Sequence, residues 1–314
     1  MPGSKNNRET AARLILADFC SRRGFSVETL SSGLKTTIVA VSTPFQLYVE
    51  SLDLVGISES ENPADGLLAT LAYRVYSSVC GSLALVAIGQ LQEAEIVART
   101  IVESSVNTLY ILKEDTENRL LQFFLSYIDI ERTQNQRWEK TLATHDRAET
   151  MEHRERIKQK ALALDAYERF LASVATQVNV AQPSRVWPKM DRLFQAIGQE
   201  LGYRTVYAAL CSQSHHDAED ILNRFFVDSH PETGDLSSRM RREKHTFSLY
   251  MVLSAVNYFL ETMEELGHRY NLLPVLGESQ RSEHAVSEQI LEMIRNLDAG
   301  TFPKQWEGKL IDGI

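Results

Sequence analysis

The feature that most constrains this sequence is the long stretch from Lys113 to Ala181, which contains neither glycine nor proline. These two residues are the strongest local interrupters of regular structure. They are scarce elsewhere too, with 15 glycines and 8 prolines among 314 residues. Few interruptions mean long elements, and the apolar spacing of this chain is helical. We therefore predict an all-α fold, a multi-helix bundle, in which this stretch forms one very long helix or a helical hairpin.

The middle of this stretch, about residues 131–165, is densely charged, with both signs mixed. Apolar residues are frequent just before it, between Leu120 and Ile130, and become too sparse within it to indicate a coiled coil. Alternating charge of this kind is typical of a helix surrounded by solvent. The alternative interpretation of this charged segment is that it forms a binding surface. We expect a long, highly charged helical arm or hairpin.

A second stretch, residues 94–113, is apolar around most of a helical circumference. The exception is a polar stripe of Glu95, Arg99, Glu103 and Asn107 at intervals of four residues. Residues four apart share a helix face, so the two carboxylates bracket the guanidinium. A helix with such a wide apolar surface is expected at the centre of the bundle, with neighbours on several sides. Arg99 and Glu103 are then either an exposed stripe or a charge pair inside the bundle.

Interruptions in the pattern suggest how the chain is organised. Asn62 directly before Pro63 predicts a capped helix start. Residues 1–60 are expected to be an N-terminal segment, mostly helical although it contains runs of strand-favouring residues. Residues 61–270 should form the main helical bundle, including the arm, and residues 271–314 a C-terminal helix and tail.

Composition argues for a cytoplasmic protein. The three cysteines are far apart and form no CxxC pair, so neither a disulfide framework nor a zinc knuckle is indicated. The N-terminus lacks the apolar core of a signal peptide. The most apolar run, residues 75–89, is shorter than the roughly 20 residues that span a bilayer, so no membrane is expected. A net charge of −9 does not support broad nucleic-acid binding, although a local basic patch is compatible with it.

A polar segment near residue 215 contains candidate chemistry. If a helix runs through it, His215 with Glu219 and His216 with Asp220 are pairs four residues apart. Such pairs supply either metal ligands or a histidine–carboxylate dyad for proton transfer. The structural alternative is a helix start that Ser214 or Ser212 caps, with the acidic residues that follow favouring the helix dipole. A metal usually needs three or four protein ligands, so we expect no resident cofactor.

Two sets of residues carry a resemblance to a known family. They are Arg99, Glu103 and Tyr110 in the apolar helix, and Trp187, Tyr207, Ser212, His215 and His216 further along. Over about residues 60–270 the chain resembles domain-of-unknown-function family 5677, whose members are uncharacterised, largely bacterial, all-helical proteins. The resemblance implies an all-α fold in which Arg, Glu, Ser and His side chains are drawn together. It implies no established activity.

That family is similar in general shape to the helical HEPN group, whose ribonucleases use an Arg-x4–6-His motif at a dimer interface. The pairs that match this spacing are Arg147 with His153, Arg224 with His230, and Arg239 with His245. The HEPN motif usually has a polar residue directly after the arginine, and all three pairs here have an apolar residue there. This departure argues against a HEPN-type nuclease.

Three function classes follow, and the sequence does not decide whether the protein is an enzyme. The first is an interaction or regulatory protein of bacterial stress responses or phage defence, which binds a protein partner or forms a homo-oligomer. Arg99–Glu103 and Ser212–His216 would then be a buried polar cluster that fixes the bundle. The second is a metal-independent ribonuclease with His215 or His216 as general acid/base and Arg99 stabilising the transition state. The third is a metal-dependent hydrolase that uses residues 215–220.

The surroundings of the polar stripe distinguish these classes. Convergence of Arg99, Glu103, Ser212 and His216 on an open pocket would favour an enzyme. A sealed, mutually hydrogen-bonded cluster would favour a structural role. A stripe that faces solvent would count against both kinds of site.

Overall fold

A computed structural model describes residues 3–54, 62–146, 149–213, 222, 225 and 234–307. All regular elements within these residues are helical, which confirms the all-α prediction. The long helices are α1 (Gly3–Ser21), α2 (Ser32–Leu54), α3 (Pro63–Ala87), α4 (Leu91–Lys113), α5 (Thr116–Leu142), α6 (Met151–Gln177), α11 (Gly234–Arg269) and α12 (Leu273–Ala299). The short elements are α7 (Met190–Ala196), α8 (Glu200–Gly202), a π-helix (Tyr203–Tyr207), α9 (Ala208–Gln213) and the 3-10 turns Val27–Thr29 and Lys304–Trp306.

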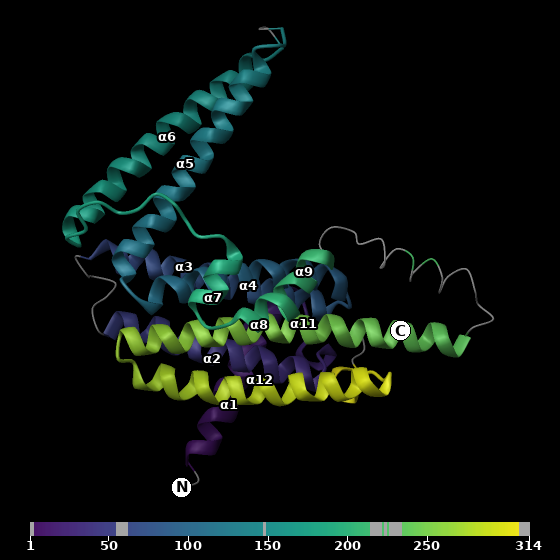
Figure 1. The fold of residues 1–314 in the computed structure, drawn as a ribbon. Coiled ribbons are helices and arrows are strands. Elements are labelled where there is room, and N and C mark those ends of the chain that lie inside the picture. Colours follow the sequence, from purple (N-terminus) through teal and green to yellow (C-terminus); the bar gives the residue numbers. More distant parts are fainter. Residues whose placement is uncertain are drawn as a thin grey trace.

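Helix α4 lies at the centre of the bundle, as its apolar circumference predicts. Helices α3 and α11 pack along it, and α7 and α9 cover another side (Figure 1). The predicted cap of α3 is present: Asn62 Oδ1 accepts a hydrogen bond from the Ala64 amide at 3.0 Å, and Pro63 is the first helical residue. Between α3 and α4 the chain turns at Gly89, whose φ of 76° is a left-handed conformation that glycine adopts without strain.

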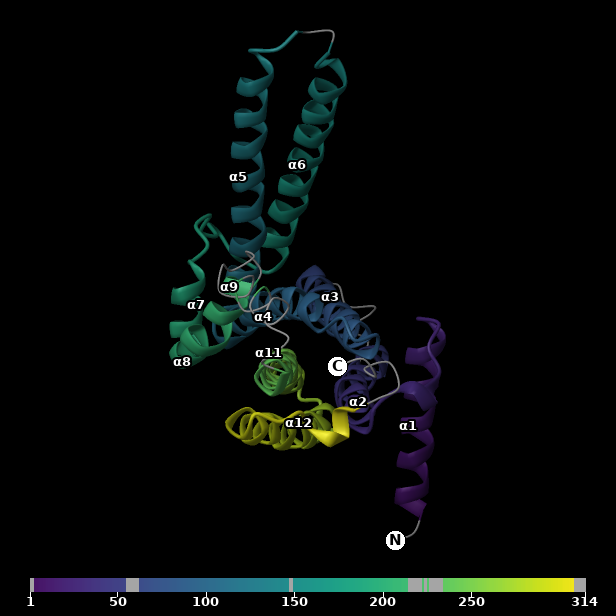
Figure 2. The same cartoon turned by 90° about the vertical axis from the view of Figure 1, so that its right-hand side faces the viewer.

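A second layer lies behind α4. Helix α11 packs on α4, α12 packs on α11, and α2 packs on α12 (Figure 2). The turn Lys304–Trp306 buries Trp306 against α2, where a side chain at Gly33 would come within 2.6 Å of the indole. The C-terminal segment therefore packs against the N-terminal segment. The predicted division at about residues 60 and 270 falls between helices and stays a prediction as a division into domains.

Helix α2 shows that the N-terminal segment is helical despite its strand-favouring residues. The helix continues through Pro44 without a break. The side chains that suggested strands, among them Ile38 and Val41, are fully buried on one side of this helix. Burial of an apolar face thus outweighs the local β preference and the lost hydrogen bond at the proline.

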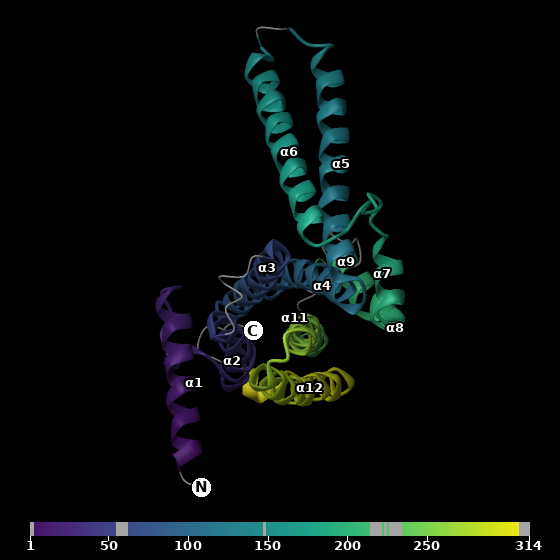
Figure 3. The same ribbon diagram turned by 90° about the vertical axis from the view of Figure 1, so that its left-hand side faces the viewer.

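Helices α5 and α6 form an antiparallel hairpin that projects from the body, so the predicted charged arm is a hairpin (Figures 1 and 3). Its seam is lined by residues seven positions apart: Leu121, Ile128, Asn135 and Leu142 on α5, and Ile157, Leu164 and Leu171 on α6. A repeat of seven is the spacing of a coiled coil. The sparse apolar residues of this region are thus placed where they form one continuous seam.

Candidate functional site

Arg99 and Glu103 form an ion pair on α4, and Tyr207 joins it. Arg99 Nε donates to Glu103 Oε1 at 2.9 Å, and the Tyr207 hydroxyl donates to the same oxygen at 2.8 Å. The Arg99 and Glu103 side chains are 28% and 32% exposed. The pair is therefore hydrogen-bonded and partly covered, neither sealed nor facing open solvent. Burial, with the neighbouring Glu103 carboxylate, raises the pKa of Tyr207, which keeps this hydroxyl protonated as a donor.

The backbone before Tyr207 explains how it reaches α4. Residues Tyr203–Tyr207 form a π-helix, a rare geometry that is frequent at functional sites. Tyr203 stacks on Tyr207 with ring centroids 5.6 Å apart, and both contact Phe194 of α7. Gly202 precedes the π-helix where a side chain would clash with the hydroxyl of Tyr258 on α11. Close packing on α11 and α7 therefore fixes the position of this turn.

The polar stripe continues to Asn107, which bonds to the chain beyond α6. The Asn107 amide donates to the Glu103 backbone carbonyl at 2.7 Å. Trp187 Nε1 donates to Asn107 Oδ1 at 2.8 Å. The indole also packs edge-on against Tyr110 and Phe123, with centroids 5.3 and 5.0 Å away. Trp187 thus joins α4 to the base of the hairpin.

The other end of the stripe, Glu95, is inside the bundle. It is 2% exposed and accepts a hydrogen bond from the Ser248 hydroxyl of α11. Burial raises the pKa of Glu95. The hydrogen bond from Ser248 and the nearby Lys244 act in the opposite direction and partly offset this rise. Burial also lowers the pKa of Lys244. These groups couple α4 to α11 and form the most deeply buried part of the stripe.

The structure brings only part of the predicted site together. Arg99 and Glu103 are paired, whereas Ser212 lies exposed on α9. The remaining candidates, His215, His216, Glu219 and Asp220, lie outside the described residues. Among the described residues, no group of three or more His, Cys, Asp or Glu side chains is placed to hold a metal ion.

One of the three Arg-x4–6-His pairs lies within the described residues. Arg239 is exposed and bonds Glu243 on the same helix, with Nε to Oε1 at 2.7 Å. His245 is partly buried, and burial beside Arg241 lowers its pKa. Arg147 and both residues of the Arg224 pair lie outside the described part of the chain.

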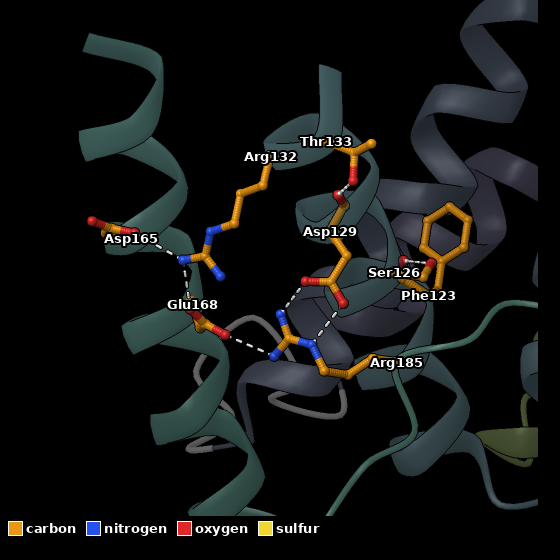
Figure 4. Close-up of polar contacts among 8 residues, drawn as sticks. All are labelled: Phe123, Ser126, Asp129, Arg132, Thr133, Asp165, Glu168 and Arg185. Carbon is orange, nitrogen blue, oxygen red and sulfur yellow. Dashed lines mark hydrogen bonds and ion pairs between the residues drawn. The ribbon is translucent and has the colours of Figure 1, made fainter. Parts of the chain in front are cut away.

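A charge network at the base of the hairpin was not predicted. We call the non-helical residues 178–189, between α6 and α7, the strap. Arg185 of the strap donates to both carboxylate oxygens of Asp129 on α5, at 2.8 and 2.5 Å, and to Glu168 on α6 at 2.7 Å (Figure 4). Arg132 donates to Glu168 at 2.6 Å and to Asp165 at 2.8 Å. Bonding to Arg185 lowers the pKa of Asp129, and bonding to Arg132 and Arg185 lowers that of Glu168.

The strap also encloses a groove against α6. The groove has a volume of about 610 Å³. Its walls combine apolar residues, among them Leu125, Leu171 and Val180, with the polar residues Glu168, Thr176, Asn179 and Arg185. The two charged groups are already occupied by the network described above.

The hairpin has two different faces. The strap face carries Asp129, Arg132, Asp165 and Glu168, and Arg185 of the strap bonds two of them, Asp129 and Glu168 (Figure 4). The open face carries Tyr127, Glu131, Lys160 and Tyr167. Residue positions two apart on a helix differ by roughly 200°, so Tyr127 points away from Asp129. Glu131 of α5 forms an ion pair with Lys160 of α6. This contact shows that the two residues lie on the same face of the hairpin.

Large apolar side chains are exposed on this open face. Tyr127 is 46% and Tyr167 52% exposed, and Ile130 and Phe170, three residues further along each helix, are about equally exposed. Nearer the tip, Trp138 contacts His153 with ring centroids 5.6 Å apart. Exposed apolar residues that gather on one face are characteristic of interaction surfaces.

The fold and these contacts define an all-α bundle with a projecting hairpin, built around a polar stripe on its central helix. A family model described as a family of unknown function (DUF5677) matches residues 65–233, which run from α3 through the hairpin and beyond α9. The chain belongs to this family, as the residues of α4 and of the Tyr207 segment indicated. No curated protein and no solved structure matches the chain. In the part of the chain that the structure describes, no helix is long and apolar enough to cross a membrane.

Proposed function

We propose that this protein is an interaction protein and that the α5–α6 hairpin is its binding arm. The observation that carries the proposal is the exposure of Tyr127 and Tyr167 on the open face of an element that projects from the body. Tyrosine supplies large contact area with a polar hydroxyl and is enriched in protein interfaces. A projecting element with such a face is accessible to a partner from several directions.

The base of the arm supports this role. Arg185 joins the strap to both helices of the hairpin, and Trp187 joins it to Asn107 on α4. A binding element that is fixed before its partner arrives loses less conformational entropy on binding. The strap thus supplies the preorganisation that a recognition arm requires.

In this proposal the Arg99–Glu103–Tyr207 cluster serves the fold. Arg99 bonds a carboxylate on its own helix, and the shared Glu103 oxygen binds the π-helix to α4. Since the π-helix bonds Glu103 and the strap bonds Asn107 on the same face of α4, these contacts help to position the segments at the base of the arm. Arg99 and Glu103 are partly exposed, which is compatible with this role because the hydrogen bonds to Glu103, and not burial, hold the π-helix against α4.

The metal-independent ribonuclease and the metal-dependent hydrolase are the alternatives for this chain. Both depend on His215 or His216, so the described geometry supports them less than the binding arm. We include in the proposal a cytoplasmic, regulatory setting in bacterial stress or phage defence, which rests on the family resemblance alone.

Site-specific photocrosslinking in cells tests the proposal. A benzophenone amino acid is placed at Tyr127 or Tyr167, and matched controls carry it at Tyr73 of α3 or Leu291 of α12, which are exposed apolar positions on the body. We expect protein adducts from the two hairpin positions and far fewer from the body positions. Equal adducts from all four positions, or none from the hairpin, would contradict a binding arm.

A further inference from the structure

We propose that the open face of the hairpin binds a second copy of this chain, so that two hairpins pack face to face as a four-helix bundle. This inference rests on the proposed binding arm and names its partner. It uses Tyr127, Tyr167, Ile130 and Phe170 as the apolar contacts and the Glu131–Lys160 pair as the polar centre. Bundles of four antiparallel helices are a stable way to cover such faces.

The charge of the arm favours self-association. From Thr116 to Gln177 the sequence has ten acidic and ten basic residues, so the hairpin is neutral although the whole chain carries −9. The entire negative charge therefore belongs to the rest of the protein. A two-fold interface places a surface against itself, which a neutral surface with both signs tolerates and an acidic surface opposes. Two copies can thus meet through their hairpins at lower electrostatic cost than through their bodies.

The free part of the face matches a small dimer interface. Each hairpin helix has 27 residues, or about 40 Å, but at the base Leu120 of α5 is fully buried against α3 and α4, so about two thirds of this length is free. With a width of about 20 Å across two helices, the free face offers on the order of 500 Å² on each copy, near the low end of specific interfaces. The exposed tyrosines lie in the half of this area that is nearer the body.

A buried amide at the hairpin seam supports the same inference. Asn135 is 7% exposed, and neither its oxygen nor its nitrogen has a hydrogen-bond partner among the described residues. It lies one helical turn after Glu131 of the open face and occupies the seam position between Ile128 and Leu142. A single polar residue at such a position is known to select register and partner number in helical assemblies, at a cost in stability.

Sedimentation equilibrium of the purified full chain tests the inference. We expect the wild type at about 10–100 µM to have twice the mass of the 35.6 kDa chain. Tyr127→Lys combined with Tyr167→Lys places four added charges in the interface and should weaken dimerisation at least about tenfold. The matched control is Leu162→Lys, an equally exposed apolar residue of α6 outside the open face, which should leave the dimer unchanged.

The outcomes separate this inference from the proposed function. A wild-type monomer across that range, or a dimer that the double substitution leaves intact, would overturn the inference. If the double variant does not fold, as judged by circular dichroism, Ile130→Lys at the edge of the same face replaces it and carries the same expectation. A monomeric chain whose hairpin still crosslinks to another protein in cells would retain the binding arm and exclude the second copy as its partner.

Discussion

Arg185 and Trp187, two residues apart in the strap, bond to different parts of the molecule. Arg185 bonds Asp129 and Glu168 of the hairpin, and Trp187 bonds Asn107 of α4. Both contacts lie where the arm meets the body, so the strap links the two. Together with the packing of Leu120 against α3 and α4, they hold the arm against the body.

Arg185→Ala should loosen the strap without unfolding the protein. The substitution removes the ion-pair partner of Asp129, whereas Glu168 keeps Arg132, and the network is partly exposed, so the global free energy of unfolding should fall by less than about 1 kcal/mol. Hydrogen exchange of residues 178–189 should become faster. Arg156→Ala, which removes an exposed pair with Glu152 on the same hairpin, is the control and should leave that exchange unchanged.

Trp187→Phe tests the contact between the strap and α4. The phenyl ring retains the aromatic packing on Tyr110 and Phe123 but lacks the N–H that bonds Asn107. Loss of this hydrogen bond should destabilise the protein by about 1–2 kcal/mol in urea unfolding. Trp138→Phe near the hairpin tip should cost less, and an equal cost for both substitutions would argue against the role of the indole N–H.

Tyr207→Phe tests whether the α4 cluster serves the fold. Removing the hydroxyl deletes its bond to Glu103 and leaves the Arg99–Glu103 pair in place. We expect a loss of about 1 kcal/mol in unfolding free energy and faster hydrogen exchange in residues 203–213, with crosslinking from the hairpin preserved. Unchanged stability together with lost crosslinking would instead indicate that this hydroxyl contacts a partner.

The stability should also depend on pH through carboxyl groups between α11 and α12. Burial raises the pKa of Glu261 to about 7, and burial together with Glu264 and Glu261 raises that of Glu283 to about 7. Because these pKa values are higher in the folded than in the unfolded chain, the folded state binds more protons. Stability is then greatest below about pH 4.5 for these groups and falls as the pH rises through 7.

Paired substitutions measure this effect. Between pH 5 and pH 8 each carboxyl should lose about two pK units of stabilisation, so Glu261→Gln and Glu283→Gln should together reduce the decline in unfolding free energy by up to about 5 kcal/mol. Glu288→Gln, an exposed change on α12, is the control. An identical pH profile for the wild type and the double variant would show that neither carboxyl titrates in this range.

The ribonuclease alternative has a direct test. Purified protein is incubated with RNA in EDTA, beside a variant carrying His215→Ala and His216→Ala. The binding-arm account predicts no cleavage by either protein. Cleavage by the wild type that disappears in the variant would establish a metal-independent nuclease and place its site.

Much of the architecture could be predicted because it depends on local periodicity. The apolar circumference of residues 94–113 indicated a central helix, and Asn62 with Pro63 indicated the start of α3. The pairing of Arg99 with Glu103 follows from a spacing of four residues on one helix. Each of these features is encoded within a few helical turns.

The contacts of the strap could not be predicted because they join residues far apart in the sequence. Asp129 and Arg185 are separated by the whole of α6, and nothing in their neighbours marks them as partners. Likewise, the π-helix that directs Tyr207 toward α4 depends on Phe194 and on the close approach at Gly202, which are tertiary contacts. The seam of the hairpin was concealed because charged residues surround its few apolar positions.

The most direct test of the account is the distance between the arm and the body in solution. Spin labels are attached through keto amino acids at Thr144 near the hairpin tip and at Leu291 on α12, so that the native cysteines are untouched. Pulsed electron resonance should give one narrow distance distribution for the wild type and a much broader one for Arg185→Ala combined with Trp187→Phe. A broad distribution in the wild type would contradict an arm that the strap holds in place.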